Sequence, residues 1–285
     1  MKILLAGATG YIGSALLPAL VTAGHSVTAL VRDETKALAV RGKGAATVVG
    51  DITDRALVTQ LASAADAVVT VASPGGASSK DDETAFAEAV LEGLGSGKTF
   101  VRTGGIWVHG PGVIDEDTPR DAPALTAWRE AVDTRVLRAP GIRSILIEPG
   151  IVYGHGGGIP TVAVAAARAG TFVGPGTQHW TTVHVDDLAE LYVAALERAE
   201  PGSAFFGVGG DNPTTREIGE AVARRLGLQG VGPETAESLV RRLGLFGEAL
   251  LLDQQATGEK ARTVLSWKPS RPSLLEDIAD GSYDA

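Results

Sequence analysis

The chain has 285 residues, of which 44% are hydrophobic, and a formal net charge of −9 at pH 7. This length suits one large α/β domain or a main domain with a small annex. The acidic balance argues against nucleic acid and anionic membrane surfaces as partners, because both need a basic footprint. The chain has no cysteine, which excludes disulfides and cysteine-based catalysis. The apolar run after the single N-terminal lysine is too short for the signal peptide of a secreted protein, and no other apolar run approaches ~18 residues, so we expect a cytoplasmic protein.

Apolar runs typical of strands alternate with helical patterns over the first two thirds of the chain. Strands are predicted at 2–6, 26–31, 45–49, 66–71, 98–103 and 143–148, and helices between them at 12–23, 34–41, 54–64, 81–95 and 124–138. The strand runs are short and apolar on both faces, as in a parallel sheet covered by helices on each side. We therefore expect an α/β fold with a doubly wound parallel sheet of the Rossmann type.

Beyond residue 150 the pattern loosens, and glycine- and proline-rich pieces separate shorter elements. Helices are predicted at 186–198 and 214–226. No internal repeat and no low-complexity linker marks a boundary. We assign residues 1–150 to a dinucleotide-binding core and 151–285 mostly to a small C-terminal substrate-binding annex, with the 183–198 segment packing back on the core.

The first strand is followed by the segment GATGYIG at 7–13, which opens the first helix. In this context Gly7 allows a tight turn, Gly10 lets backbone N–H groups approach a pyrophosphate, and Gly13 lets the helix pack close to the strand. The N-terminus of the helix adds partial positive charge. The alternative is a glycine-rich strand–helix turn that binds nothing.

The second strand ends in Arg32 followed by Asp33. A carboxylate at this point holds the ribose 2′-OH of NAD, whereas an arginine suits the 2′-phosphate of NADP through charge-assisted hydrogen bonds. The order of the two residues favours NADP(H). A solvated Arg–Asp pair is the alternative.

Six segments in this order resemble the extended and atypical branches of the short-chain dehydrogenase/reductase superfamily, of the NAD(P)-dependent epimerase/dehydratase type. They are GATGYIG at 7–13, GDITD at 50–54, VASPGG at 71–76, EPGIVYGHGGG at 148–158, VHVDDLAELYVAALE at 183–197 and EKARTVLSWKPSRPSLLEDI at 259–278. The resemblance covers nearly the whole chain and implies a bound nucleotide. The cofactor-binding residues that follow are Gly7, Thr9, Gly10, Tyr11, Ile12, Gly13, Arg32, Asp51, Ile52, Ala72, Ser73, Thr103, Pro149, Gly150 and Val152.

The chain departs from that family where the reaction is carried out. Members use a tyrosine and a lysine four residues later on one helix to move the proton that accompanies the hydride. The corresponding segment, ALTAWREAVDTRVL, places Trp128 or Leu125 at the tyrosine position and Val132 or Arg129 at the lysine position. The pair is therefore absent from the sequence, and the loss favours an acceptor that is activated before the hydride arrives, or an acid from elsewhere.

His109 is the best replacement acid in the sequence, because it follows the fifth strand and its pKa lies near working pH. Thr103 keeps a hydroxyl near the expected nicotinamide, and Tyr153 is predicted to line the same cavity. The alternatives are a solvent-facing loop histidine for His109 and a packing role for Tyr153. Glu148 replaces the arginine that family members carry before Pro149.

A substrate pocket rich in aromatic side chains is expected beside the nicotinamide. Its predicted members are Trp107, Trp128, His155, His179 and Trp180. His184 opens the helix predicted at 186–198 and is expected to be structural or to cap it. No spacing of histidine and carboxylate residues predicts a metal site.

Three functions remain open from the sequence. The first is an NADP(H)-dependent reductase of a small or medium organic substrate with a C=N, C=C or C=O bond, in biosynthesis or secondary metabolism. The second is a redox-neutral epimerase, dehydratase or cyclase of the same family, and the third is a non-catalytic NADP(H) sensor. The resemblance also allows a homodimer through the helices at 81–95 and 124–138.

Overall fold

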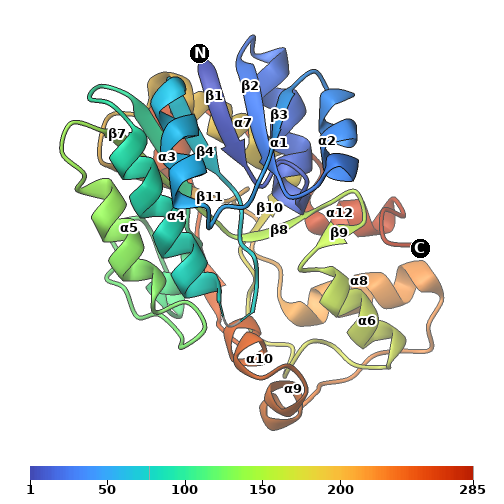
Figure 1. Ribbon diagram of the computed structural model, residues 1–285. Helices are drawn as coiled ribbons and strands as arrows, with labels where there is room; N and C mark the ends of the chain where they lie inside the picture. The colour runs from blue at the N-terminus through green and yellow to red at the C-terminus, as the bar shows by residue number, and fades with distance from the viewer. Residues whose placement is uncertain (77, 285) are drawn as a thin grey trace.

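The computed structural model describes residues 1–76 and 78–284, and a seven-stranded parallel sheet lies at the centre of this described part (Figure 1). The strand order is β11-β7-β5-β4-β1-β2-β3. The strands are β1 (Lys2–Ala6), β2 (Ser26–Val31), β3 (Ala46–Val49), β4 (Ala67–Thr70), β5 (Thr99–Thr103), β7 (Arg143–Pro149) and β11 (Ser203–Gly207). This is the doubly wound Rossmann-type architecture that the sequence predicts.

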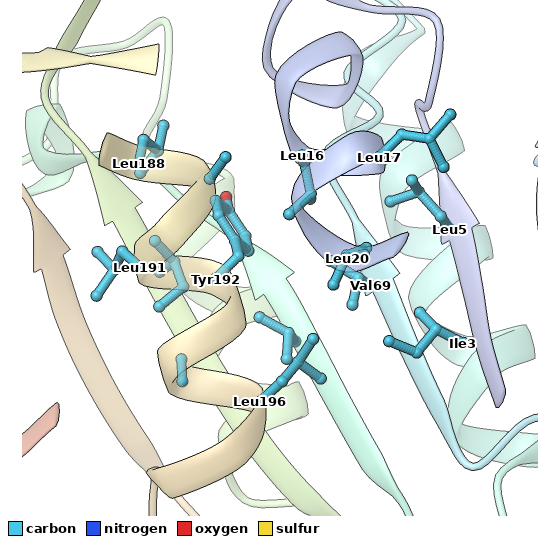
Figure 2. Packing of buried hydrophobic residues seen from close by; sticks show 14 of the residues in the cluster. Ile3, Leu5, Leu16, Leu17, Leu20, Val69, Leu188, Leu191, Tyr192 and Leu196 are labelled. Atoms are coloured by element: carbon cyan, nitrogen blue, oxygen red, sulfur yellow. The ribbon is translucent and has the colours of Figure 1, made fainter. Parts of the chain in front are cut away.

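Helices cover both faces of the sheet. One face carries α1 (Tyr11–Thr22), α2 (Glu34–Arg41), α7 (Val185–Arg198) and α11 (Glu259–Leu265), and the other carries α3 (Arg55–Ala64), α4 (Ser79–Gly93) and α5 (Arg129–Leu137). Figure 2 shows the first face, where Leu17 of α1 lies near Leu5 and Leu20 lies near Val69. Tyr192 and Leu196 of α7 belong to the same cluster. Burial of these large apolar side chains is the main stabilising contribution.

The remaining helices pack around a second cluster of buried side chains, and short strands connect them to the main sheet. A small sheet joins β8 (Ile151–Gly154), β9 (Gly157–Gly158) and β10 (Thr182–His184), and a two-stranded pairing joins β6 (Gly112–Val113) to β12 (Gln254–Gln255). The helices are α6 (Thr161–Arg168), α8 (Thr215–Leu226), α9 (Ala236–Leu243), α10 (Leu245–Leu250) and α12 (Leu274–Ala279). Among the residues described, none of the helices combines the length and apolar character that crossing a membrane requires.

The predicted strands and helices of the first two thirds are confirmed within a few residues, with one informative difference. The helix predicted over 124–138 begins only at Arg129. Residues 124–128 form turns instead, in which the N–H groups of Thr126 and Ala127 both donate to the carbonyl oxygen of Pro123. These turns place Leu125, Thr126 and Trp128 at the edge of a cavity.

His184 has the capping role that the sequence predicts. It is the N-cap of α7, and its Nδ1 accepts a hydrogen bond from the backbone N–H of Asp186 at 3.1 Å. Burial lowers the pKa of His184, which favours the neutral ring that this cap needs.

Candidate functional site

The strand order reverses between β1 and β4, and the chain therefore leaves their carboxyl ends in opposite directions. Two adjoining cavities lie at this edge of the sheet. The first, here called the nucleotide groove, has a volume of about 610 Å³, and the second, here called the inner cavity, has a volume of about 480 Å³. They share Ile12, Val71, Ala72, Ser73, Val152 and Ile159, so the two form one continuous cleft.

Most of the residues predicted to bind the cofactor lie along this cleft. The nucleotide groove is lined by Gly7, Thr9, Gly10, Tyr11, Ile12, Arg32, Asp51, Ile52, Ala72, Ser73 and Val152. Thr103, Pro149 and Gly150 line the inner cavity. Gly13 lines neither cavity, because it is buried where α1 meets the loop after β1.

The three glycines of the first loop have different physical constraints. Gly7 has φ +93°, and a Cβ there would lie 2.6 Å from the backbone nitrogen of Ala72. A Cβ on Gly13 would lie 1.9 Å from the carbonyl oxygen of Gly7. At Gly10 a Cβ would make one contact, a tight 3.3 Å to the carbonyl oxygen of Gly7, and Gly10 lines the groove. The first two glycines are therefore required by packing, and Gly10 leaves room for a ligand.

The N-terminus of α1 faces the same groove. Its N-cap, Gly10, offers no side chain to hydrogen-bond the first-turn N–H groups. These N–H groups have no partner within the helix, and together with the helix dipole they favour an anion. The groove thus has the elements that bind a pyrophosphate.

Two exposed cations line the groove, Arg32 just after β2 and Lys36 in the first turn of α2. No ion pair joins Arg32 to Asp33 within the described part of the chain, because Asp33 is the N-cap of α2 and accepts from the Lys36 N–H at 2.8 Å. The sequence interpretation missed Lys36, although its place four residues after Arg32 was a usable signal. Hydrogen bonds from Thr53, followed by the charge of Arg32, hold the pKa of Asp51 below its usual range.

The inner cavity is largely apolar and has aromatic walls. The structure brings together Thr103, Trp107 and Trp128, as predicted, and adds Phe246 from α10. The rings of Trp107 and Phe246 are 6.0 Å apart between centroids and tilted by 58°. A flat organic molecule fits such walls.

The hydroxyl of Thr103 is held on the sheet side of the cavity. Its Oγ1 donates to the carbonyl oxygen of Thr70 at 2.6 Å and lies 2.5 Å from the hydroxyl of Tyr192, which is then the donor to Thr103. Burial raises the pKa of Tyr192, so this phenol stays protonated. The proton of Thr103 is therefore engaged with Thr70 in this arrangement.

His109 lies outside the cavity, which corrects the predicted placement. The side chain is 5% exposed and is not among the lining residues. Nδ1 donates to the carbonyl oxygen of Thr118 at 2.8 Å, Nε2 lies 3.4 Å from the Glu148 carboxylate, and the ring packs edge-on against Phe206. The short helix Ile106–His109 turns the ring toward β7, where the buried carboxylate of Glu148 needs a partner.

His109→Gln is expected to lower stability more at acid pH than at alkaline pH. Burial lowers the pKa of His109, but the Glu148 carboxylate and the Thr118 carbonyl raise it by more, and the net shift is upward. The stabilisation is complete below the unfolded pKa and is lost as pH rises through the folded one. Unfolding free energies at about pH 5.5 and about pH 9 test this. His25→Gln is the control and should show the opposite trend, because burial and the N-terminal charge lower the pKa of His25.

Four other predicted site residues also lie away from the inner cavity. Tyr153 and Trp180 are buried in the second cluster and donate to the carbonyl oxygens of Pro272 and Leu250. His179 pairs with Asp253 at 2.7 Å, and His155 pairs with Asp186 at 3.0 Å. The expectation that they line or roof the cavity is wrong, because each of these side chains is engaged with a partner elsewhere in the fold.

One group of potential metal ligands occurs in the described part of the chain, formed by His155, His184 and Asp186. Nδ1 of His184 already accepts the Asp186 N–H, so the neutral ring carries its proton on Nε2 and has no free lone pair. The group is accounted for by a helix cap and an ion pair. It does not suit a metal ion without rearrangement.

A chain of alternating charges, here called the buried ion network, runs beneath the inner cavity. Arg102 is 1% exposed and pairs with Glu83 at 3.1 Å and with Asp133 at 2.8 Å. Arg120 pairs with Asp133 at 3.0 Å and with Glu148 at 3.3 Å. Arg129, which lines the inner cavity, pairs with Glu83 at 2.9 Å. The sequence interpretation missed the network; the arginine inside the apolar run TFVRT was the signal.

Comparison with known proteins places the cleft in context. Residues 7–199 match the family model described as NAD(P)H-binding. A 3-diazoavenalumate denitrifying reductase from a Streptomyces species is 32% identical over 98% of this chain and 99% of its own length. A 2-alkyl-3-oxoalkanoate reductase from Stenotrophomonas maltophilia is 27% identical over 88% and 83%, respectively. The crystal structure of human epimerase family protein SDR39U1 with NADPH aligns with a TM-score of 0.77 at 22% identity, covering 99% of this chain and 100% of that one.

Proposed function

We propose a function for this chain from its membership of the NAD(P)H-binding family, in the atypical branch of the short-chain dehydrogenases/reductases. The chain is an NADP(H)-dependent reductase of a small, flat organic acceptor, one whose reacting bond is already polarised before the hydride arrives. The nucleotide supplies hydride chemistry when bound. The observation that carries this proposal is the continuous cleft, in which a groove suited to a dinucleotide opens directly into an apolar cavity beside Thr103.

The lining of the inner cavity supports a pre-activated acceptor. Its described polar side chains are Ser73, Ser79, Thr103, Thr126 and Arg129. Hydroxyl groups of this kind and an arginine are poor general acids at neutral pH. Reduction of an unactivated ketone needs such an acid, whereas a conjugated or otherwise polarised acceptor needs it less. The Streptomyces relative is named for a diazo substrate, a group already electrophilic before reduction.

Arg32→Ala is expected to reduce the difference in binding free energy between NADPH and NADH by ~1–3 kcal/mol, because the variant lacks the charge-assisted contact of Arg32 with the 2′-phosphate. Dissociation constants of both nucleotides for the wild type and the variant test this. Arg41→Ala, also at the surface and paired with Glu34, is the control and should leave both constants unchanged. Equal wild-type affinity for the two nucleotides would remove the assignment of NADP(H).

The reductase proposal is tested by following NADPH absorbance with a panel of acceptors of similar size. We expect faster oxidation of NADPH by a conjugated enone or an aromatic diazo compound than by phenylacetone, a ketone whose carbonyl is not conjugated with its ring. Conversion of substrate with no net loss of NADPH would indicate the redox-neutral alternative. Tight binding of NADPH with no conversion over a broad panel would indicate the sensor.

A further inference from the structure

Arg129 is the one charged residue among the described residues that line the inner cavity. It is the first residue of α5, and it follows the turns that place Leu125 and Trp128 on the same wall. Around it the cavity is formed by aromatic rings, aliphatic side chains, glycines and hydroxyl groups. A single cation in an apolar cavity needs a physical explanation, because burial of a charge is costly.

The guanidinium of Arg129 is held in place by hydrogen bonds, but not all of its N–H donors have an acceptor. Its NH2 group donates to Glu83 Oε1 at 2.9 Å and to Ser73 Oγ at 3.3 Å, and NH1 lies 3.5 Å from the carbonyl oxygen of Thr103. The group also lies 4.9 Å from the centre of the Trp128 ring. An arginine has five N–H donors, and Nε has no hydrogen-bond partner within the described part of the chain. One NH1 hydrogen is likewise left over. Nε–H and NH1 lie on different edges of the guanidinium, so each can donate to one ligand oxygen.

The charge of Arg129 is only partly balanced by its protein partner. Glu83 is shared, because Arg102 binds its other oxygen at 3.1 Å. The next carboxylate, Asp133, is occupied by Arg102 and Arg120. Burial lowers the pKa of Arg129, which expresses the cost of removing this cation from water. An anion in the cavity offsets that cost.

We propose that Arg129 forms an anion subsite that binds a carboxylate of the hydride acceptor, while the flat apolar part of the same molecule lies against Trp107, Trp128 and Phe246. A carboxylate fits because its negative charge balances the guanidinium, and one of its oxygens can accept a charge-assisted hydrogen bond from a remaining N–H donor. The inference rests on the proposed function in taking the ligand to be the acceptor. It narrows the acceptor class, since a plain cationic acceptor would be repelled by Arg129.

The test compares two flat probes of nearly equal size, benzoate and benzamide, by calorimetric titration of the protein saturated with NADP+. We expect benzoate to bind at least about 10-fold more tightly than benzamide, the effect of a charge-assisted pair. Arg129→Met should abolish this preference, and Arg129→Lys should retain part of it. Arg135→Met changes an exposed arginine of the same helix and should leave the preference intact.

Two outcomes would overturn the inference. One is equal binding of the two probes by the wild type, which needs no variant to fold. The other is a preference that survives in Arg129→Met while affinity for NADP+ falls, which would assign Arg129 to the nucleotide. The titration does not depend on turnover. If the protein binds benzoate selectively but none of the acceptors supports oxidation of NADPH, the proposed reductase is refuted and the anion subsite is retained.

Discussion

Gly10→Val is expected to abolish detectable binding of both NADPH and NADH while the protein remains folded. A Cβ at Gly10 approaches protein atoms no closer than 3.3 Å, at the carbonyl oxygen of Gly7, so the added side chain extends into the groove. There it fills the space that a pyrophosphate needs beside the first turn of α1. Fluorescence titration of reduced nucleotide, with the unfolding transition recorded in parallel, measures both quantities.

Gly42→Val is the matched control for this substitution. Gly42 is exposed at the end of α2 with φ −61°, and a Cβ there would make only contacts of 3.6 Å or more. Its nucleotide affinity should equal that of the wild type. Retained affinity in a folded Gly10→Val protein would mean that the pyrophosphate does not lie over this loop.

Arg102→Met should destabilise the fold by about 3–5 kcal/mol, the cost of breaking a buried ion pair from one side. Arg102 separates Glu83 from Asp133, and all three side chains are almost completely buried. Methionine supplies a similar apolar stem but no donors, so each carboxylate loses one cationic partner without gaining access to water. Denaturant unfolding of wild type and variant gives the difference in free energy.

Arg135→Met is the control for Arg102→Met, because Arg135 of α5 pairs with Glu88 of α4 at the exposed surface of the helices that cover this face of the sheet. Exposed pairs of this kind contribute about 0–1 kcal/mol. A similar decrease in the free energy of unfolding in both variants would show that the buried ion network stabilises the fold no more than ordinary surface charges do.

The arrangement of the sheet was predictable because most of its strands can be recognised from their own local sequence. Runs such as KILLA and SILIE are apolar on both faces, and the intervening helices begin at recognisable caps such as Asp54 and Asp33. The seventh strand, β11, was missed. Its segment SAFFG is short and lies among glycines, so only pairing with β7 reveals it.

The nucleotide groove was predictable for the same reason, since its residues follow strand ends whose order is set by the fold. The inner cavity was not predictable from local pattern, because side-chain direction decides its lining. His109 follows β5 as expected, yet its ring turns toward the buried Glu148. Phe246 comes from a helix far along the chain, and Arg129 is directed by Glu83, so tertiary contacts place both.

The central claim is that hydride passes from the nucleotide groove to an acceptor in the inner cavity. Single turnover with NADPH deuterated at the transferable position, followed by mass spectrometry of the product, tests it most directly. We predict one deuterium in the product of a conjugated acceptor and one equivalent of NADP+ formed, and loss of both in Gly10→Val. A product without deuterium, or unchanged NADPH beside converted substrate, would contradict this account.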